Sequence, residues 1–151
     1  MTVQAHEPAP PPDVAGIVLD GDDYTITAEN NRVVCESSGA KPADDGTAHP
    51  IFALIATQVA MKLSVGELLA LCDFDVADGP MMAGCEIAYQ APLRVGETYR
   101  VRGRIESLVR KPSKRLGIMD LLTHSLDLHD RDGALVLSTI NNWVLPRGGK
   151  S

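Results

Sequence analysis

One almost wholly apolar segment, residues 51–63, restricts the fold of this chain more than any other feature. Only Thr57 and Gln58 interrupt it before Lys62, so a helix here would be apolar over most of its surface. The segment is shorter than the ~18 residues that a membrane-spanning helix needs. We therefore expect a buried helix at 51–63, in which Ile55 and Val59 are covered by other elements.

Beyond Met81 the sequence is typical of long strands that have one buried and one exposed face. Strands are predicted at 85–89, 98–110, 116–129 and 134–145, with a hairpin turn at 130–133. Helices are expected at 28–38, after the N-cap Thr27, and at 65–72, after Ser64. Such a sheet must cover its apolar face, and only segment 51–63 is apolar enough. The order predicts an α+β fold, an antiparallel meander wrapped around a central helix.

The length of 151 residues predicts one domain with a single core. We expect a proline-rich leader at 1–13, a domain at 14–147 and a tail at 148–151. The net charge of -6 would repel a phosphate backbone, so nucleic acid is not an expected partner. The chain shows neither a long apolar run nor a secretory signal, which predicts a cytoplasmic protein without membrane contact.

The three cysteines, Cys35, Cys72 and Cys85, have the spacing of neither a disulfide framework nor a zinc site. We interpret them as reduced core residues. No metal and no cofactor is expected.

The most specific stretch of the sequence is the run Tyr89-Gln90-Ala91-Pro92-Leu93-Arg94-Val95-Gly96-Glu97. Weaker matches are residues 24–30 before Ser38-Gly39, residues 48–54 and the Asp132-Gly133 hairpin. Together these stretches resemble the MaoC-like acyl-thioester hydratases and dehydratases, over residues 17–147. The resemblance implies a hot-dog fold that forms a homodimer, or a heterodimer with a second hot-dog chain. It also implies an (R)-specific enoyl-thioester hydratase or 3-hydroxyacyl-thioester dehydratase, or a subunit of one, acting on acyl-CoA.

An aspartate and a histidine, with four residues between them, form the active site that this resemblance implies, and they exchange protons with water and the acyl chain. Ala40 and Asp45 stand at the two expected positions. The same spacing recurs at Asp44 and His49, which we take as the candidate catalytic pair. A structural role for His49 at the start of the central helix stays open. Pro50, Ile51, Phe52 and Ala53, at the start of the central helix, form the thioester-binding segment that the resemblance implies, because a helix N-terminus carries unpaired backbone N–H donors.

Two alternative functions stay open. A non-catalytic hot-dog subunit, which binds an acyl thioester or only a partner chain, fits the alanine at position 40. A thioesterase is disfavoured, because thioesterases of the hot-dog fold commonly use an acidic residue on the central helix, and segment 51–63 contains none.

Three arginines, Arg100, Arg102 and Arg104, share one face of a predicted strand. We interpret this face as solvated, and contact with the phosphates of coenzyme A is the alternative. His124 is expected to be a hydrogen-bonded core residue, and His129 is expected to be solvated.

Overall fold

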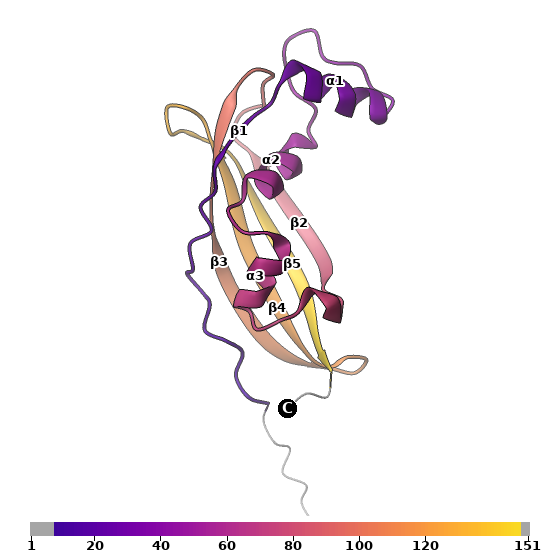
Figure 1. Ribbon diagram of the computed structural model, residues 1–151, viewed down its shortest axis with the longest axis vertical. Helices are drawn as coiled ribbons and strands as arrows, with labels where there is room; N and C mark the ends of the chain where they lie inside the picture. Colours follow the sequence, from indigo (N-terminus) through magenta and orange to yellow (C-terminus); the bar gives the residue numbers. More distant parts are fainter. Residues whose placement is uncertain (1–7, 149–151) are drawn as a thin grey trace, which may run out of the picture.

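A five-stranded antiparallel sheet forms the body of the computed structural model, which describes residues 8–148 (Figure 1). The expected leader and tail therefore lie partly outside the described residues, at 1–7 and 149–151. The strands are β1 (Asp23–Thr25), β2 (Met81–Tyr89), β3 (Thr98–Ser113), β4 (Gly117–His129) and β5 (Leu135–Gly148).

The sheet order is β1-β3-β4-β5-β2, so β3, β4 and β5 form the predicted meander. The prediction was wrong for β2, which pairs with β5 at the far edge and not with β3, its neighbour in the sequence. The alternation of apolar and polar residues shows which face of a strand is buried, but it does not show which other strand pairs with it. The sequence therefore did not reveal that β2 pairs with β5.

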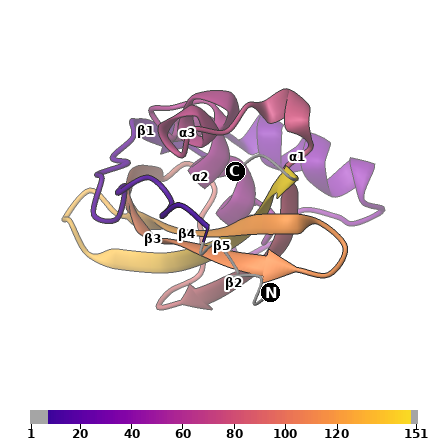
Figure 2. The ribbon, with the colours of Figure 1, turned by 90° about the horizontal axis from the view of Figure 1, so that it is seen from below.

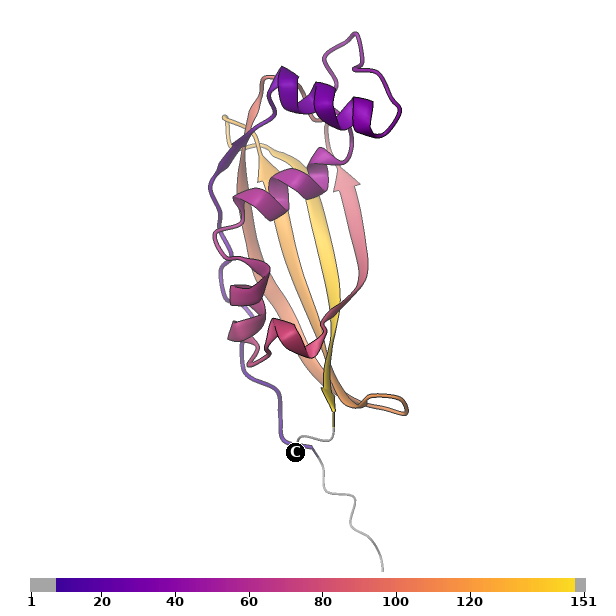
Figure 3. The ribbon, with the colours of Figure 1, turned by 45° about the vertical axis from the view of Figure 1, so that its right-hand side comes forward.

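The helices lie on one face of the sheet (Figures 2 and 3). They are α1 (Ala28–Ser37), α2 (Phe52–Ala60), α3 (Val65–Leu71) and the 3₁₀ turn η1 (Val76–Asp78). The predicted caps are confirmed: Thr27 accepts the amide N–H of Asn30, and Ser64 forms a reciprocal capping box with Glu67. Among the described residues no single helix is long and apolar enough to cross a membrane, although α2 and α3 together, bent by 65°, have the length and composition.

The central helix α2 packs mainly on β1, β3 and β4. Its buried side chains are Phe52, Ala53, Ala56, Thr57 and Ala60. The expectation that Val59 is buried was wrong, because this side chain is 68% exposed, and Ile55 is half-buried at the edge of the core. A helix that is apolar all round does not indicate which side faces the sheet. Here the small side chains of Ala53, Ala56 and Ala60 are buried against the sheet, because they permit a close approach between the helix and the strands.

The segment before β1 runs along the outer edge of β3 (Figure 1). The amide N–H groups of Gly16, Leu19 and Gly21 donate to carbonyl groups of β3. At Gly21 an added Cβ would lie 2.0 Å from the carbonyl oxygen of Ala60, so only glycine allows this approach to α2. The edge of β3 is therefore covered along much of its length, whereas β2 presents an open edge.

Candidate active site

The chain that leads into α2 is held between α1 and the loop before β3. The side chain of Asn31, buried in α1, accepts the amide N–H of His49 at 2.8 Å. The amide N–H of Ala48 donates to the carbonyl oxygen of Leu93 at 2.8 Å. These two bonds place the His49 ring beside the start of α2.

Both ring nitrogens of His49 have partners within the chain. Nδ1 accepts the amide N–H of Ile51 at 3.1 Å, and Nε2 lies 3.3 Å from Oγ of Ser38. The Ser38 hydroxyl lies 3.0 Å from the carbonyl oxygens of Val34 and Cys35, to which it donates. This network assigns the Nε2–H tautomer, in which Nε2 donates to Ser38. The neutral ring has one nitrogen that can accept a hydrogen bond, Nδ1, and this nitrogen already accepts the amide N–H of Ile51 at the start of α2.

Asp44 lies in an exposed turn, and neither hydrogen bond of the His49 ring involves it. The neighbouring Asp45 is held by a hydrogen bond: its carboxylate accepts the amide N–H of Thr47 at 2.9 Å. This bond lowers the pKa of Asp45. The structure thus joins His49 to Ser38 and Ile51 and does not pair it with Asp44.

The first amide groups of α2 also have internal partners. Phe52 donates to the carbonyl oxygen of His49 at 3.1 Å, Ala53 to that of Pro50 at 3.1 Å, and Leu54 to that of Ile51 at 2.9 Å. Pro50 has no N–H group. Of the expected thioester-binding segment, Pro50 and Ile51 are exposed, and Phe52 and Ala53 are buried in the core. In this arrangement the end of α2 has no free donor for a thioester carbonyl.

Sequence reasoning missed three residues that build this region: Asn31, Ser38 and Tyr89. The hydroxyl of Tyr89, on β2, donates to the carbonyl oxygen of Pro50 at 3.0 Å, and burial raises its pKa. Ser38 and Tyr89 belong to the stretches that carry the family resemblance, but their contacts with residues 49 and 50 depend on the tertiary fold.

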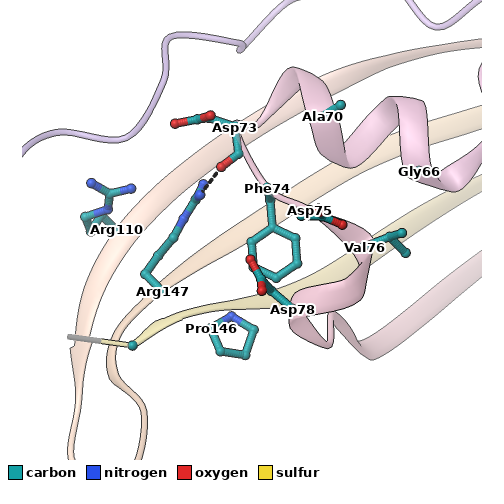
Figure 4. Close-up of a pocket in the computed structure, with 11 residues that line it drawn as sticks. Gly66, Ala70, Asp73, Phe74, Asp75, Val76, Asp78, Arg110, Pro146 and Arg147 are labelled. Atoms are coloured by element: carbon teal, nitrogen blue, oxygen red, sulfur yellow. Dashed lines mark hydrogen bonds between the residues drawn. The ribbon is translucent and has the colours of Figure 1, made fainter. Parts of the chain in front are cut away.

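A cavity of about 940 Å³ lies between α3, η1 and the strands β3 and β5 (Figure 4). Its charged lining is Asp73, Asp75, Asp78, Arg110 and Arg147. The guanidinium of Arg147 stacks 5.4 Å from the ring centre of Phe74 and donates to the carbonyl oxygen of Asp73. Arg110 and Arg147 both pair with the carboxylate of the buried Asp120, and none of the predicted site residues lines the cavity. Residues 8–148 also contain no cluster of His, Cys, Asp or Glu side chains that could hold a metal ion.

Solved structures identify the fold as the hot-dog fold. A chain of the ChsH1–ChsH2 complex from Mycobacterium tuberculosis superposes with a TM-score of 0.68 at 16% identity, covering 90% of this chain and 86% of that one. The HadBC (3R-hydroxyacyl-ACP dehydratase) complex from the same organism gives 0.65 at 18% identity, with 87% and 97% covered. A MaoC-like dehydratase from Rhodospirillum rubrum gives 0.64 at 17% identity, with 89% and 94% covered.

The expected hot-dog α+β fold is thus confirmed, and the resemblance to MaoC-like dehydratases holds at the level of the fold. A protein named as a hypothetical thioesterase, from Streptococcus pneumoniae, shares this fold as well, with a TM-score of 0.55 at 9% identity. No family model and no curated protein matches the sequence. The fold alone therefore does not distinguish a dehydratase from a thioesterase, and the residues of the candidate site must be used for this.

Proposed function

We propose that this chain is the non-catalytic subunit of a hot-dog enoyl-thioester hydratase or 3-hydroxyacyl-thioester dehydratase acting on acyl-CoA. A second hot-dog chain would carry the acid–base pair, and this chain would complete the sheet and the acyl site. The carrying observation is the His49 ring, whose only lone pair accepts a helix N–H group. A general base must have a free lone pair within reach of the substrate proton.

The internal bonds of the α2 N-terminus support the same proposal, because a hydratase of this type needs free N–H groups to polarise the thioester carbonyl. Two of the similar structures, HadBC and ChsH1–ChsH2, are by their names complexes, which supports a partner chain. A thioesterase is less well supported, since α2 contains no acidic residue.

Hydration of crotonyl-CoA, followed by the loss of enone absorbance, tests this proposal. The purified chain alone should show no rate above that of buffer. His49→Ala should instead lower the free energy of unfolding by about 1–2 kcal/mol, because it removes two side-chain hydrogen bonds. If the chain alone hydrates the substrate, and His49→Ala lowers that rate by about 10²–10⁴-fold, then the residue is a catalytic acid or base and the proposal is wrong.

The open edge of β2 is the proposed subunit interface. Within residues 8–148 this strand pairs only with β5, and it exposes Met81, Met82, Ile87 and Tyr89. An unpaired strand with large apolar side chains favours pairing with the edge of another chain. When the second chain is absent, we expect two copies of this chain to pair through the same edge.

Light scattering at micromolar concentration should therefore give twice the chain mass. Ile87→Lys, which places a charge on the β2 edge, should give the mass of one chain. Val33→Lys is the matched control, since this residue is exposed on α1, and it should leave the mass unchanged. A wild-type chain that scatters as a single copy would count against β2 as the interface.

A further inference from the structure

A second cavity, of about 470 Å³, is rich in positive charge although the chain as a whole is acidic. It lies where β1, β3 and the β4–β5 turn meet. Three arginines line it, Arg100 and Arg102 on β3 and Arg131 in the turn, together with His129 at the end of β4. With a net charge of -6 for the whole chain, such a group of cations makes a local region that attracts anions.

The strand alternation places these groups on the face of the sheet that points away from α2. Val101 and Leu128 are fully buried on the helix side, so Arg100, Arg102 and His129 point to the other side. In the register of β3 and β4, Arg100 lies directly opposite His129. The expectation that His129 is solvated was wrong: the residue is half-buried, and its Nδ1 is buried without a hydrogen-bond partner among the described residues.

Two carboxylates also line the cavity, and both have other partners. Asp23 accepts Nε of Arg100 at 2.8 Å. Asp130 accepts the amide N–H groups of Asp132 and Ala134, at 3.0 and 2.9 Å, and so shapes the turn.

Arg102 forms no ion pair with any residue of 8–148. Asp127 stands opposite it in the register without bonding to it. Arg131 makes one long hydrogen bond, 3.4 Å to Oγ1 of Thr98. The cavity thus holds two guanidinium groups, those of Arg102 and Arg131, with unused donor capacity.

We propose that this cavity is a binding site for a phosphate group, as a phosphomonoester or a diphosphate. Guanidinium groups bind phosphate oxygens through paired, charge-assisted hydrogen bonds, and a tetrahedral phosphate can accept from several directions at once. The phosphate can belong to the coenzyme A portion of an acyl-CoA, which rests on the proposed function, or to a free phosphorylated molecule, which does not.

Calorimetric titration of the full chain at low and at physiological salt tests the site with four probes: inorganic phosphate, pyrophosphate, coenzyme A and 3′-dephospho-coenzyme A. At least one probe should bind, more weakly at the higher salt. Arg102→Gln and Arg131→Gln should each weaken binding by about tenfold or more, since each removes a charged hydrogen bond. Arg115→Gln is the matched control, an exposed arginine in the turn between β3 and β4, outside the cavity. It should bind as the wild type does.

The probes separate the two sources of the phosphate. Coenzyme A that binds more tightly than its dephospho form, by a margin that Arg102→Gln abolishes, identifies the acyl-CoA substrate. Pyrophosphate that binds as tightly as coenzyme A identifies a free phosphorylated ligand. Absence of binding by all four probes at millimolar concentration, or wild-type affinity in both arginine variants, overturns the proposal. The readout is binding and not hydration or chain mass, so its failure is distinct from a failure of the proposed function.

Discussion

Replacing Asp120 with alanine should lower the free energy of unfolding by about 3–5 kcal/mol, because it breaks a buried ion cluster. The Asp120 side chain is fully buried and accepts from both neighbouring guanidinium groups. Arg110 donates to it through Nε at 2.8 Å and Nη2 at 3.0 Å, and Arg147 donates through Nε at 2.8 Å. The variant leaves two largely buried cations without their counter-charge.

The cluster also joins three parts of the chain that are distant in sequence. Nη1 of Arg110 donates to the carbonyl oxygen of Ala9 at 2.7 Å, and Arg147 donates to those of Cys72 and Asp73 beyond α3. Losing Asp120 therefore frees the arginines that hold the leader and the end of α3 against the sheet. Figure 4 shows the bond from Arg147 to Asp73.

Urea unfolding near neutral pH measures this effect. Asp132→Ala, in the exposed β4–β5 turn, removes the same charge and should change stability by no more than about 0.5 kcal/mol. A cost for Asp120→Ala as small as that of the control would mean that the cluster contributes nothing net.

Local sequence signals were sufficient to predict most elements of this fold. Thr27 and Ser64 mark helix starts through side-chain oxygens that accept an amide N–H group a few residues later. The hairpin at 130–133 follows from Asp130 and Gly133, which close the turn with a hydrogen bond of 3.0 Å between their backbones. Signals of this kind depend only on neighbouring residues, so a sequence displays them directly.

Pairings between distant segments were not predictable in the same way. Packing between elements decides that β2 pairs with β5. It also decides which side of α2 faces the sheet. The same holds at the candidate site. The spacing of Asp44 and His49 indicated an acid–base pair, but the contact with Ser38 arises from the placement of α1, for which no local signal exists.

The buried His124 illustrates a partly correct prediction. It lies in the core as expected, 1% exposed, on β4 opposite Asn141 of β5. It is not the hydrogen-bonded histidine that was expected, since its Nδ1 and the Oδ1 of Asn141 are both buried without partners among residues 8–148. Burial lowers the pKa of His124 from 6.5 to about 4, so the folded chain holds the ring neutral.

This lowered pKa predicts a marked loss of stability in mild acid. Between pH 6.5 and about 4 the unfolded chain binds a proton at His124 and the folded chain does not. Stability from this residue is therefore complete above pH 6.5 and falls as the pH falls toward 4. The difference in pKa corresponds to about 3 kcal/mol, of which about 2 kcal/mol should be lost between pH 7 and pH 4.5.

Urea unfolding at these two pH values should show this loss in the wild type and a much smaller one in His124→Leu, which cannot titrate. Leu126→Ala is the control, because it disturbs the buried side of β4 without removing a titratable group, and it should keep the full pH dependence. The titration of Asp120 contributes little to the difference in stability between pH 7 and pH 4.5. Its pKa, which burial would raise, is lowered below 3.8 by the hydrogen bonds from Arg110 and Arg147, so its contribution is lost mainly below the window in which His124 acts. Equal pH dependence in the wild type and His124→Leu would show that this histidine does not hold the lowered pKa.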